Sequence, residues 1–93
     1  MERNIIIQEQ KPFPEAVYKV TVKEDGGETK HIVTLHEPYY QELTAEMISG
    51  EELIRKSFEF LLEREPKESI LKKFELPRIQ KFFQEYEETM SRG

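Results

Sequence analysis

The hydrophobic positions of the chain change their spacing near residue 48. Before it, residues 16–23 and 30–36 alternate apolar and polar side chains, as strands with one buried face do. After it, apolar residues recur every three or four positions, as in amphipathic helices. The pattern predicts an α+β fold, in which an antiparallel β-hairpin of two or three strands packs on three C-terminal helices.

A glycine pair marks the turn of the predicted hairpin. Gly26-Gly27 suits a two-residue type I′ turn, because both central residues of that turn need a positive φ. This turn fixes a register and places six side chains on one buried face. The predicted opposite pairs are Val22 with His31, Val20 with Val33, and Tyr18 with Leu35.

The first 15 residues differ from the segments that follow. We expect residues 1–15 to be a peripheral N-terminal arm, residues 16–90 a single domain and residues 91–93 a frayed tail. Pro12 and Pro14 have no amide donor, so this stretch cannot be a central strand. The run Ile5–Ile7 leaves two alternatives open: a short edge strand, or a loose arm that becomes ordered on a partner.

Three helices are predicted after the hairpin, at residues 50–65, 66–74 and 77–90. Pro38-Tyr39-Tyr40 should end the second strand, and Ser49 with Glu52 forms a capping box for the first helix. The apolar arc of helix 50–65 is wider than the stripe of about 100° typical of a surface helix, so this helix should contact two layers or another chain. The predicted core consists of the inward apolar side chains of these elements: Tyr18, Val20, Val22, Val33, Leu35, Leu53, Ile54, Phe58, Leu61, Leu62, Ile70, Leu71, Phe74, Ile79, Phe82 and Tyr86.

Composition narrows the class of protein. The chain has 93 residues, no cysteine and a net charge of −5. Disulfides and thiolate metal sites are therefore unavailable. No apolar run approaches the roughly 18 residues of a membrane span. We expect a soluble cytoplasmic protein that does not enter a membrane.

No catalytic or metal-binding motif stands out. His31 and His36 lie five positions apart on a predicted strand, so they face opposite sides and cannot chelate one ion together. Neighbouring glutamates lie on helix flanks, where they are solvated, and no serine has a nucleophile motif. The sequence predicts a protein that is not an enzyme and needs no cofactor.

Residues 67–86 offer a nucleic-acid-binding hypothesis. A short helix, a break and a second helix resemble a helix-turn-helix. Although net charge disfavours nucleic acid, residues 66–83 carry five lysine or arginine side chains and two glutamates, a local charge of +3. An ordinary helical hairpin is the competing interpretation. The residues that would contact DNA are polar or basic: Lys72, Lys73, Arg78, Gln80, Lys81 and Gln84.

Aromatic residues support a different hypothesis, the recognition of another protein. Tyr39 and Tyr40 are adjacent at the joint between hairpin and helices, and Phe60 lies in the wide apolar arc. Exposed aromatics favour protein contacts. We therefore expect these three residues to bind a protein partner, with Phe60 also available for a weak homodimer; otherwise the chain is a monomer. The alternative is that both tyrosines fill the joint.

A resemblance to a protein family rests on residues 57–66, 69–71 and 74–79. These segments, which include Phe-Leu-Leu-Glu-Arg-Glu-Pro at residues 60–66, resemble a group of small bacterial proteins of unknown function. In that group a short β segment precedes the same helix. The resemblance covers about residues 16–90 and implies a single bacterial domain. It implies no activity and no site residues.

Overall fold

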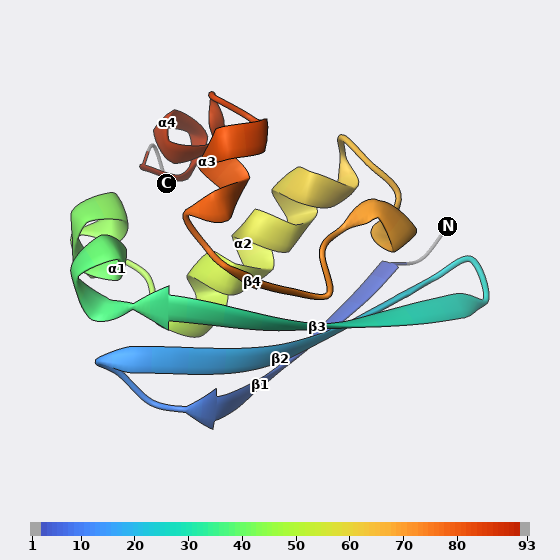
Figure 1. Ribbon diagram of the computed structural model, residues 1–93, viewed down its shortest axis with the longest axis horizontal. Coiled ribbons are helices and arrows are strands. Elements are labelled where there is room, and N and C mark those ends of the chain that lie inside the picture. The colour runs from blue at the N-terminus through green and yellow to red at the C-terminus, as the bar shows by residue number, and fades with distance from the viewer. Residues whose placement is uncertain (1–2, 92–93) are drawn as a thin grey trace.

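The computed structural model describes residues 3–91 and has an α+β fold, as the sequence predicts. Its four-stranded sheet has the order β1-β2-β3-β4, and helices cover one face while the other face is open (Figure 1). The predicted frayed tail lies outside the described residues, apart from Ser91. The elements are β1 (Arg3–Lys11), β2 (Glu15–Glu24), β3 (Gly27–His36), α1 (Glu37–Thr44), α2 (Gly50–Leu62), the 3₁₀ turn η1 (Lys67–Ser69), β4 (Lys73–Glu75), α3 (Arg78–Phe82) and α4 (Tyr86–Ser91).

The β2–β3 hairpin has the predicted buried face but a different turn. Its central residues are Asp25 and Gly26, with φ values of 57° and 77°, and Glu24 pairs with Gly27. Asp-Gly suits a type I′ turn as well as Gly-Gly does, because Asp tolerates the left-handed region. The predicted register is therefore wrong by two residues, and Val20 lies opposite His31. A shift of two leaves every side chain on its predicted face.

The N-terminal segment is an edge strand. β1 runs antiparallel to β2 from Arg3 to Lys11, with Ile5 opposite Val22 and Ile7 opposite Val20. Ile5 is buried under the helical layer. Of the two alternatives for the isoleucine run, the structure has the strand, longer than the three residues that the sequence indicated.

The second strand ends before Pro38, as predicted, and a helix that the sequence pattern does not predict follows it. α1 begins directly after the strand, with Pro38 in its first turn, where a missing amide donor costs no hydrogen bond. It ends at Thr44, and the next two residues, Ala45 and Glu46, have positive φ values, of 52° and 60°. The Pro-Tyr-Tyr sequence thus starts a helix at the place where we expected only the end of a strand.

α2 is the central helix. The Ser49 hydroxyl accepts a hydrogen bond from the Glu52 amide at 3.1 Å, as the predicted cap requires. Its wide apolar arc contacts two layers: Phe58 packs toward the sheet beside His31, and Phe60 packs against Tyr86 of α4. The helix ends at Leu62, three residues before the predicted end.

The predicted helix 66–74 is wrong. Pro66 is followed by one 3₁₀ turn, and residues 73–75 form a parallel strand beside β3. Lys73 and Glu75 are exposed while Phe74 is buried, an alternation too short to identify from sequence. Backbone hydrogen bonds from Ile32 N to Lys72 O (2.8 Å) and from Leu76 N to Thr34 O (3.0 Å) extend this pairing.

The predicted helix 77–90 is also wrong, because it is two short helices. The side chain of Gln80 stabilises the break: its Nε2 donates to Gln84 O at 2.7 Å and its Oε1 accepts from Glu87 N at 2.9 Å. The break turns α4 away from the direction of α3 (Figure 1). Phe82 is 64% exposed and Leu71 is 41% exposed, and the core assignment of both is wrong.

The other fourteen predicted core residues are buried. Further buried apolar residues are absent from the predicted core, and several of them lie in misassigned segments. They are Ile5, Ala16, Tyr40, Leu43, Phe60, Leu76 and Met90.

Replacing Phe58 with alanine should lower the free energy of unfolding by about 3–5 kcal/mol. Its ring is fully buried between His31 and Phe74, at centroid distances of 5.3 Å and 6.2 Å. Urea denaturation followed by circular dichroism measures the change. Phe82→Ala is the matched control and should change stability by less than about 0.5 kcal/mol, because its ring is mostly exposed. Equal losses in both variants would contradict the central position of Phe58.

Candidate functional site

The predicted partner-binding aromatics do not form an exposed patch. Tyr40 is buried: its ring stacks on Phe13 with centroids 4.8 Å apart, and its hydroxyl donates to Ile48 O at 2.6 Å. Tyr39 is half-buried and its hydroxyl donates to the Glu87 carboxylate at 2.9 Å. Burial, followed by this carboxylate, raises the pKa of Tyr39. The two tyrosines therefore fill the joint between sheet and helices, which was the alternative interpretation.

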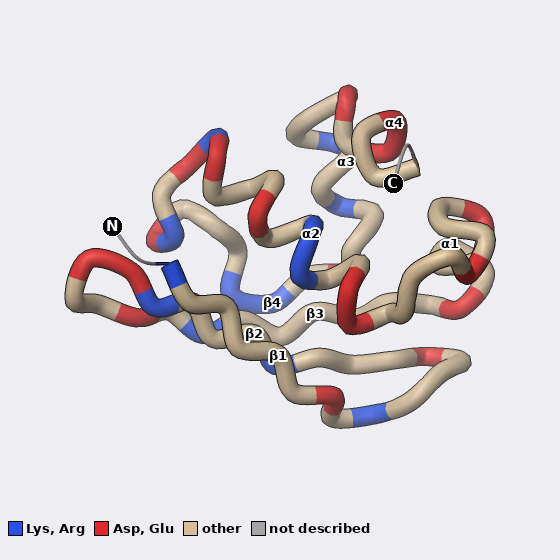
Figure 2. The backbone as a smooth tube through the Cα atoms, turned by 180° about the vertical axis from the view of Figure 1, so that it is seen from behind, with Lys and Arg blue, Asp and Glu red and all other residues tan. Residues whose placement is uncertain are grey.

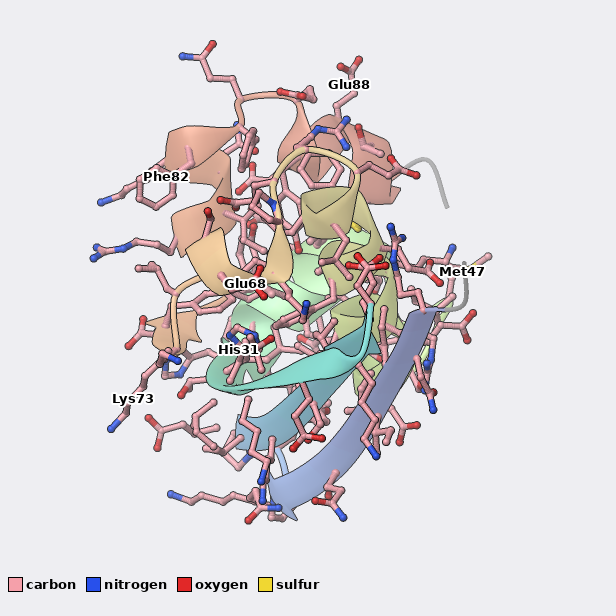
Figure 3. All side chains as sticks on the ribbon, turned by 90° about the vertical axis from the view of Figure 1, so that its right-hand side faces the viewer. His31, Met47, Glu68, Lys73, Phe82 and Glu88 are labelled. Atoms are coloured by element: carbon pink, nitrogen blue, oxygen red, sulfur yellow. The ribbon has the colours of Figure 1, made fainter. Side chains whose placement is uncertain are left out.

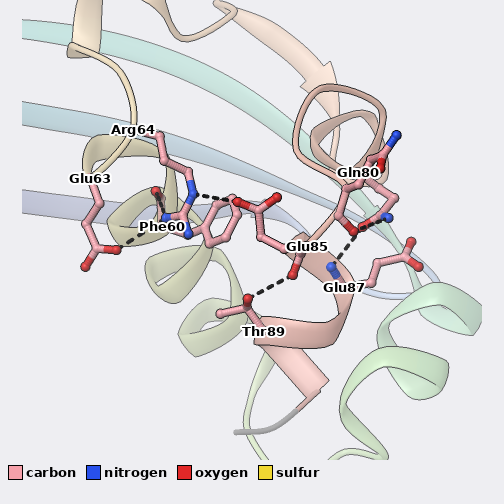
Figure 4. A network of polar contacts seen from close by, with 8 residues as sticks. Phe60, Glu63, Arg64, Gln80, Glu85, Glu87 and Thr89 are labelled. Atoms are coloured by element: carbon pink, nitrogen blue, oxygen red, sulfur yellow. Dashed lines mark hydrogen bonds and ion pairs between the residues drawn. The ribbon is translucent and has the colours of Figure 1, made fainter.

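Phe60 is also unavailable to a partner. It is 4% exposed and meets Phe83 and Tyr86 edge-on, at centroid distances of 5.9 Å and 5.3 Å. The Arg64 guanidinium covers the ring at 3.6 Å and donates to Glu85 at 3.2 Å (Figure 4). A homodimer through Phe60 is incompatible with this packing.

Five of the six predicted nucleic-acid-binding residues are exposed, but the secondary structure that carries them differs from the predicted helix-turn-helix. Lys72, Lys73, Arg78, Lys81 and Gln84 are exposed, and the basic positions follow β4 and α3 (Figure 2). The helix-turn-helix prediction for residues 67–86 is wrong, because a 3₁₀ turn, a strand and a five-residue helix occupy most of this region. A helix of five residues is about 7.5 Å long, too short to read a major groove along its length. The side chain of the sixth residue, Gln80, is committed to the break between α3 and α4.

An apolar groove lies between the end of α2, the segment η1–β4 and α3. Its volume is about 250 Å³. Phe82 and Leu71 are its most exposed apolar members, and Figure 3 shows Phe82 projecting from α3 toward solvent. We call this feature the apolar groove; its lining residues are Leu61, Glu65, Ser69, Ile70, Leu71, Phe74, Arg78, Ile79, Phe82 and Phe83.

The two charged side chains that line the apolar groove, Arg78 and Glu65, differ in their exposure to solvent. Arg78 and Lys81 are exposed on α3, and Lys72 and Lys73 are exposed at the start of β4; of these four residues only Arg78 lines the groove. Glu65 is partly buried, and desolvation raises the pKa of its carboxyl. The groove thus combines an apolar floor with one carboxylate and one guanidinium among its lining residues, while further exposed lysines lie on the neighbouring segments.

His31 attaches one wall of the apolar groove to the sheet. Its Nδ1 lies 2.8 Å from Leu71 O and its Nε2 lies 2.9 Å from Thr29 Oγ1. A carbonyl only accepts, so Nδ1 carries the proton, and the neutral Nε2 accepts from the threonine hydroxyl. Burial lowers the pKa of His31, and the charge of Lys72 adds to this effect.

The other surface hollow and the other groups of charged side chains are weaker candidates for a functional site. A wider hollow of about 410 Å³ surrounds the hairpin turn, but its lining is polar and rich in carboxylates. Within residues 3–91, no three His, Asp or Glu side chains are arranged to hold a metal ion. No helix in this part of the chain is long and apolar enough to cross a membrane.

The sequence held one signal for the apolar groove. Phe82 and Phe83 are adjacent on a helix, where neighbouring side chains point about 100° apart, so both could not face the core equally. Phe82 is predicted inside because the pattern of residues 79–90 fits one continuous helix. Leu71 carried no such signal.

Comparison with known proteins adds no assignment. No protein-family model, curated protein sequence or solved structure matches the chain. The resemblance of residues 57–79 to a family of small bacterial proteins therefore stays a prediction.

Lowering the pH below about 6.5 should destabilise the fold through His31. Its folded-state pKa lies below the value of about 6.5 in the unfolded chain, so the unfolded state binds a proton first. The stabilisation is complete above pH 6.5 and is lost as the pH falls toward the folded pKa, with a slope of at most about 1.4 kcal/mol per pH unit. Urea denaturation between pH 7.5 and pH 5, at about half-unit steps, measures the slope.

A substitution isolates this contribution from that of the carboxylates. His31→Asn keeps a donor for Leu71 O but cannot titrate, so its stability should depend less on pH than the wild type does. His36→Asn is the matched control, because the His36 side chain is 41% exposed on the open face. An unchanged pH slope in His31→Asn would refute the assignment.

Proposed function

We propose that this chain is a non-enzymatic binding module that recognises another protein through the apolar groove. The observation that carries the proposal is the pairing of Phe82 and Leu71, two large apolar side chains that remain exposed beside an apolar floor. Exposed aromatics at a concave site are typical anchors of protein interfaces.

The size of the groove favours part of a polypeptide over a whole small molecule. Its 250 Å³ is below the range of about 300–1,000 Å³ usual for small-molecule pockets. Such a volume suits one or two apolar side chains of a partner segment that continues across the surface. Phe82 and Leu71 would contact that segment at the rim.

The charges indicate the chemistry of the segment. Residues 66–83 have a local charge of +3 in a chain of net charge −5. Opposite charges across an interface speed association and set the register of the partner. We infer a short partner segment with apolar anchors and neighbouring carboxylates that face Arg78 and its lysine neighbours.

Selection from a library of random short peptides tests this proposal. Peptides that bind the wild type should combine apolar and acidic residues. Phe82→Ser and Leu71→Ser should each weaken binding of a selected peptide by about tenfold or more. Fluorescence anisotropy measures the Kd, and amide NMR shifts should be confined to residues 61–83.

Met47→Ser is the matched control, since Met47 is an apolar side chain 84% exposed outside the groove. It should leave the Kd unchanged. Equal losses in Met47→Ser, or selected peptides without acidic residues, would contradict the proposal. Duplex DNA at low salt is tested in parallel: shifts of the groove residues by DNA, with none by any peptide, would replace it with nucleic-acid binding.

A further inference from the structure

β1 is an edge strand, and the pairing register shows which of its backbone N–H and C=O groups face away from the sheet. The two-residue turn makes Glu24 and Gly27 a hydrogen-bonded pair, so every second residue back from Glu24 bonds to β3. Lys23, Thr21 and Lys19 therefore bond to β1, through Asn4, Ile6 and Gln8. The backbone groups of the alternate β1 residues, from Arg3 to Glu9, point away from the sheet.

An independent contact agrees with this assignment. Arg55 of α2 donates from Nη1 to Ile5 O at 2.8 Å, which requires that this carbonyl face the outside of the sheet. One lone pair of the carbonyl is then occupied, and the second remains available to another donor. In the side-chain hydrogen bonds described for residues 3–91, no other outward-facing backbone N–H or C=O group of β1 takes part.

Between Asn4 and Gln8 the edge lacks the usual protection against strand pairing. Exposed edges are normally interrupted by proline, inward charges or bulges. β1 has no proline, and its interior from Asn4 to Gln8 is uncharged. Its regular pairing extends from Arg3 to Glu9, where the register shifts. The midpoint of this regular stretch is Ile6.

The side chains about Ile6 are complementary to themselves. If two copies of β1 run antiparallel with Ile6 at the centre, Arg3 lies opposite Glu9, Asn4 opposite Gln8, and Ile5 opposite Ile7. Each charge meets its opposite, each amide meets an amide and each isoleucine meets an isoleucine. Ile6 is 36% exposed on the mostly polar open face, and in this arrangement it meets Ile6 of the second copy.

We propose that this chain forms a homodimer by antiparallel pairing of β1 with β1 of a second copy, centred on Ile6. The two four-stranded sheets become one eight-stranded sheet with both helical layers on the same side. Ile6 forms the central pair that is not hydrogen-bonded, the type in which cross-strand side chains are closest. Arg3, already bonded to Glu24 at 3.0 Å, has further donors for Glu9 of the second copy.

The proposal is independent of the apolar groove, because β1 and β4 are opposite edges of the sheet. A peptide can bind the groove in a monomer or a dimer. Failure of one proposal therefore leaves the other standing.

Sedimentation equilibrium of the full chain over a wide concentration range is the first test. The wild type should approach twice the monomer mass as concentration rises. Ile6→Lys places two like charges in the closest cross-strand pair and should weaken dimerisation by about tenfold or more. Thr21→Lys is the matched control: it adds the same charge to the same face, one strand further from the edge, and should dimerise as the wild type does.

Introduced cysteines test the register, because the chain has none of its own. Under oxidised glutathione, Ile6→Cys should give a disulfide-linked dimer, while Asn4→Cys alone should not. The double variant Asn4→Cys/Gln8→Cys should crosslink again. A wild type that stays monomeric at millimolar concentration, or an Asn4→Cys variant that crosslinks as fast as Ile6→Cys, would overturn the proposal.

Discussion

The pairing of β4 with β3 is the interaction on which the C-terminal half depends. Besides the ladder of β4 with β3, three hydrogen bonds attach residues 71–76 to the sheet: His31 to Leu71 O, Ile32 N to Lys72 O, and Leu76 N to Thr34 O. They direct Phe74 inward against Phe58 and place Leu71 and Lys73 at the surface. Without this attachment the segment has no wall to contribute to the apolar groove, and α3 has no fixed starting point.

The sequence predicted the parts of the fold that have long, regular patterns. Alternation over residues 16–36 identified the buried face of the hairpin, and Ser49 with Pro66 bracketed the central helix. The turn was misplaced by one residue because Asp25 and Gly27 are both acceptable beside Gly26. The side chains assigned to the buried face are nevertheless correct, because the register error is two residues and strand side chains alternate with a period of two.

The failures share a physical cause, which is that tertiary contacts decide short segments. The three residues of β4 are too few to show the alternating pattern of a strand. Their extended conformation is stabilised by pairing with β3. The single helix expected from residue 77 to 90 is interrupted by hydrogen bonds of one side chain, Gln80, to its own backbone neighbours. The candidate site lies in this region. The sequence indicates its basic residues, but it also predicts Phe82 in the core and a partner-binding role for Tyr39, Tyr40 and Phe60, which are buried or half-buried.

The hydrogen bond between His31 and Leu71 joins residues 40 positions apart. Closing a loop of that length costs chain entropy before any packing is gained, whereas the hairpin and α2 form from local contacts. We therefore expect the groove to form later than the hairpin and α2, and to open more readily than they do in the native state. A ligand in the groove would select the closed form, so its occupancy would also report that the chain has finished folding.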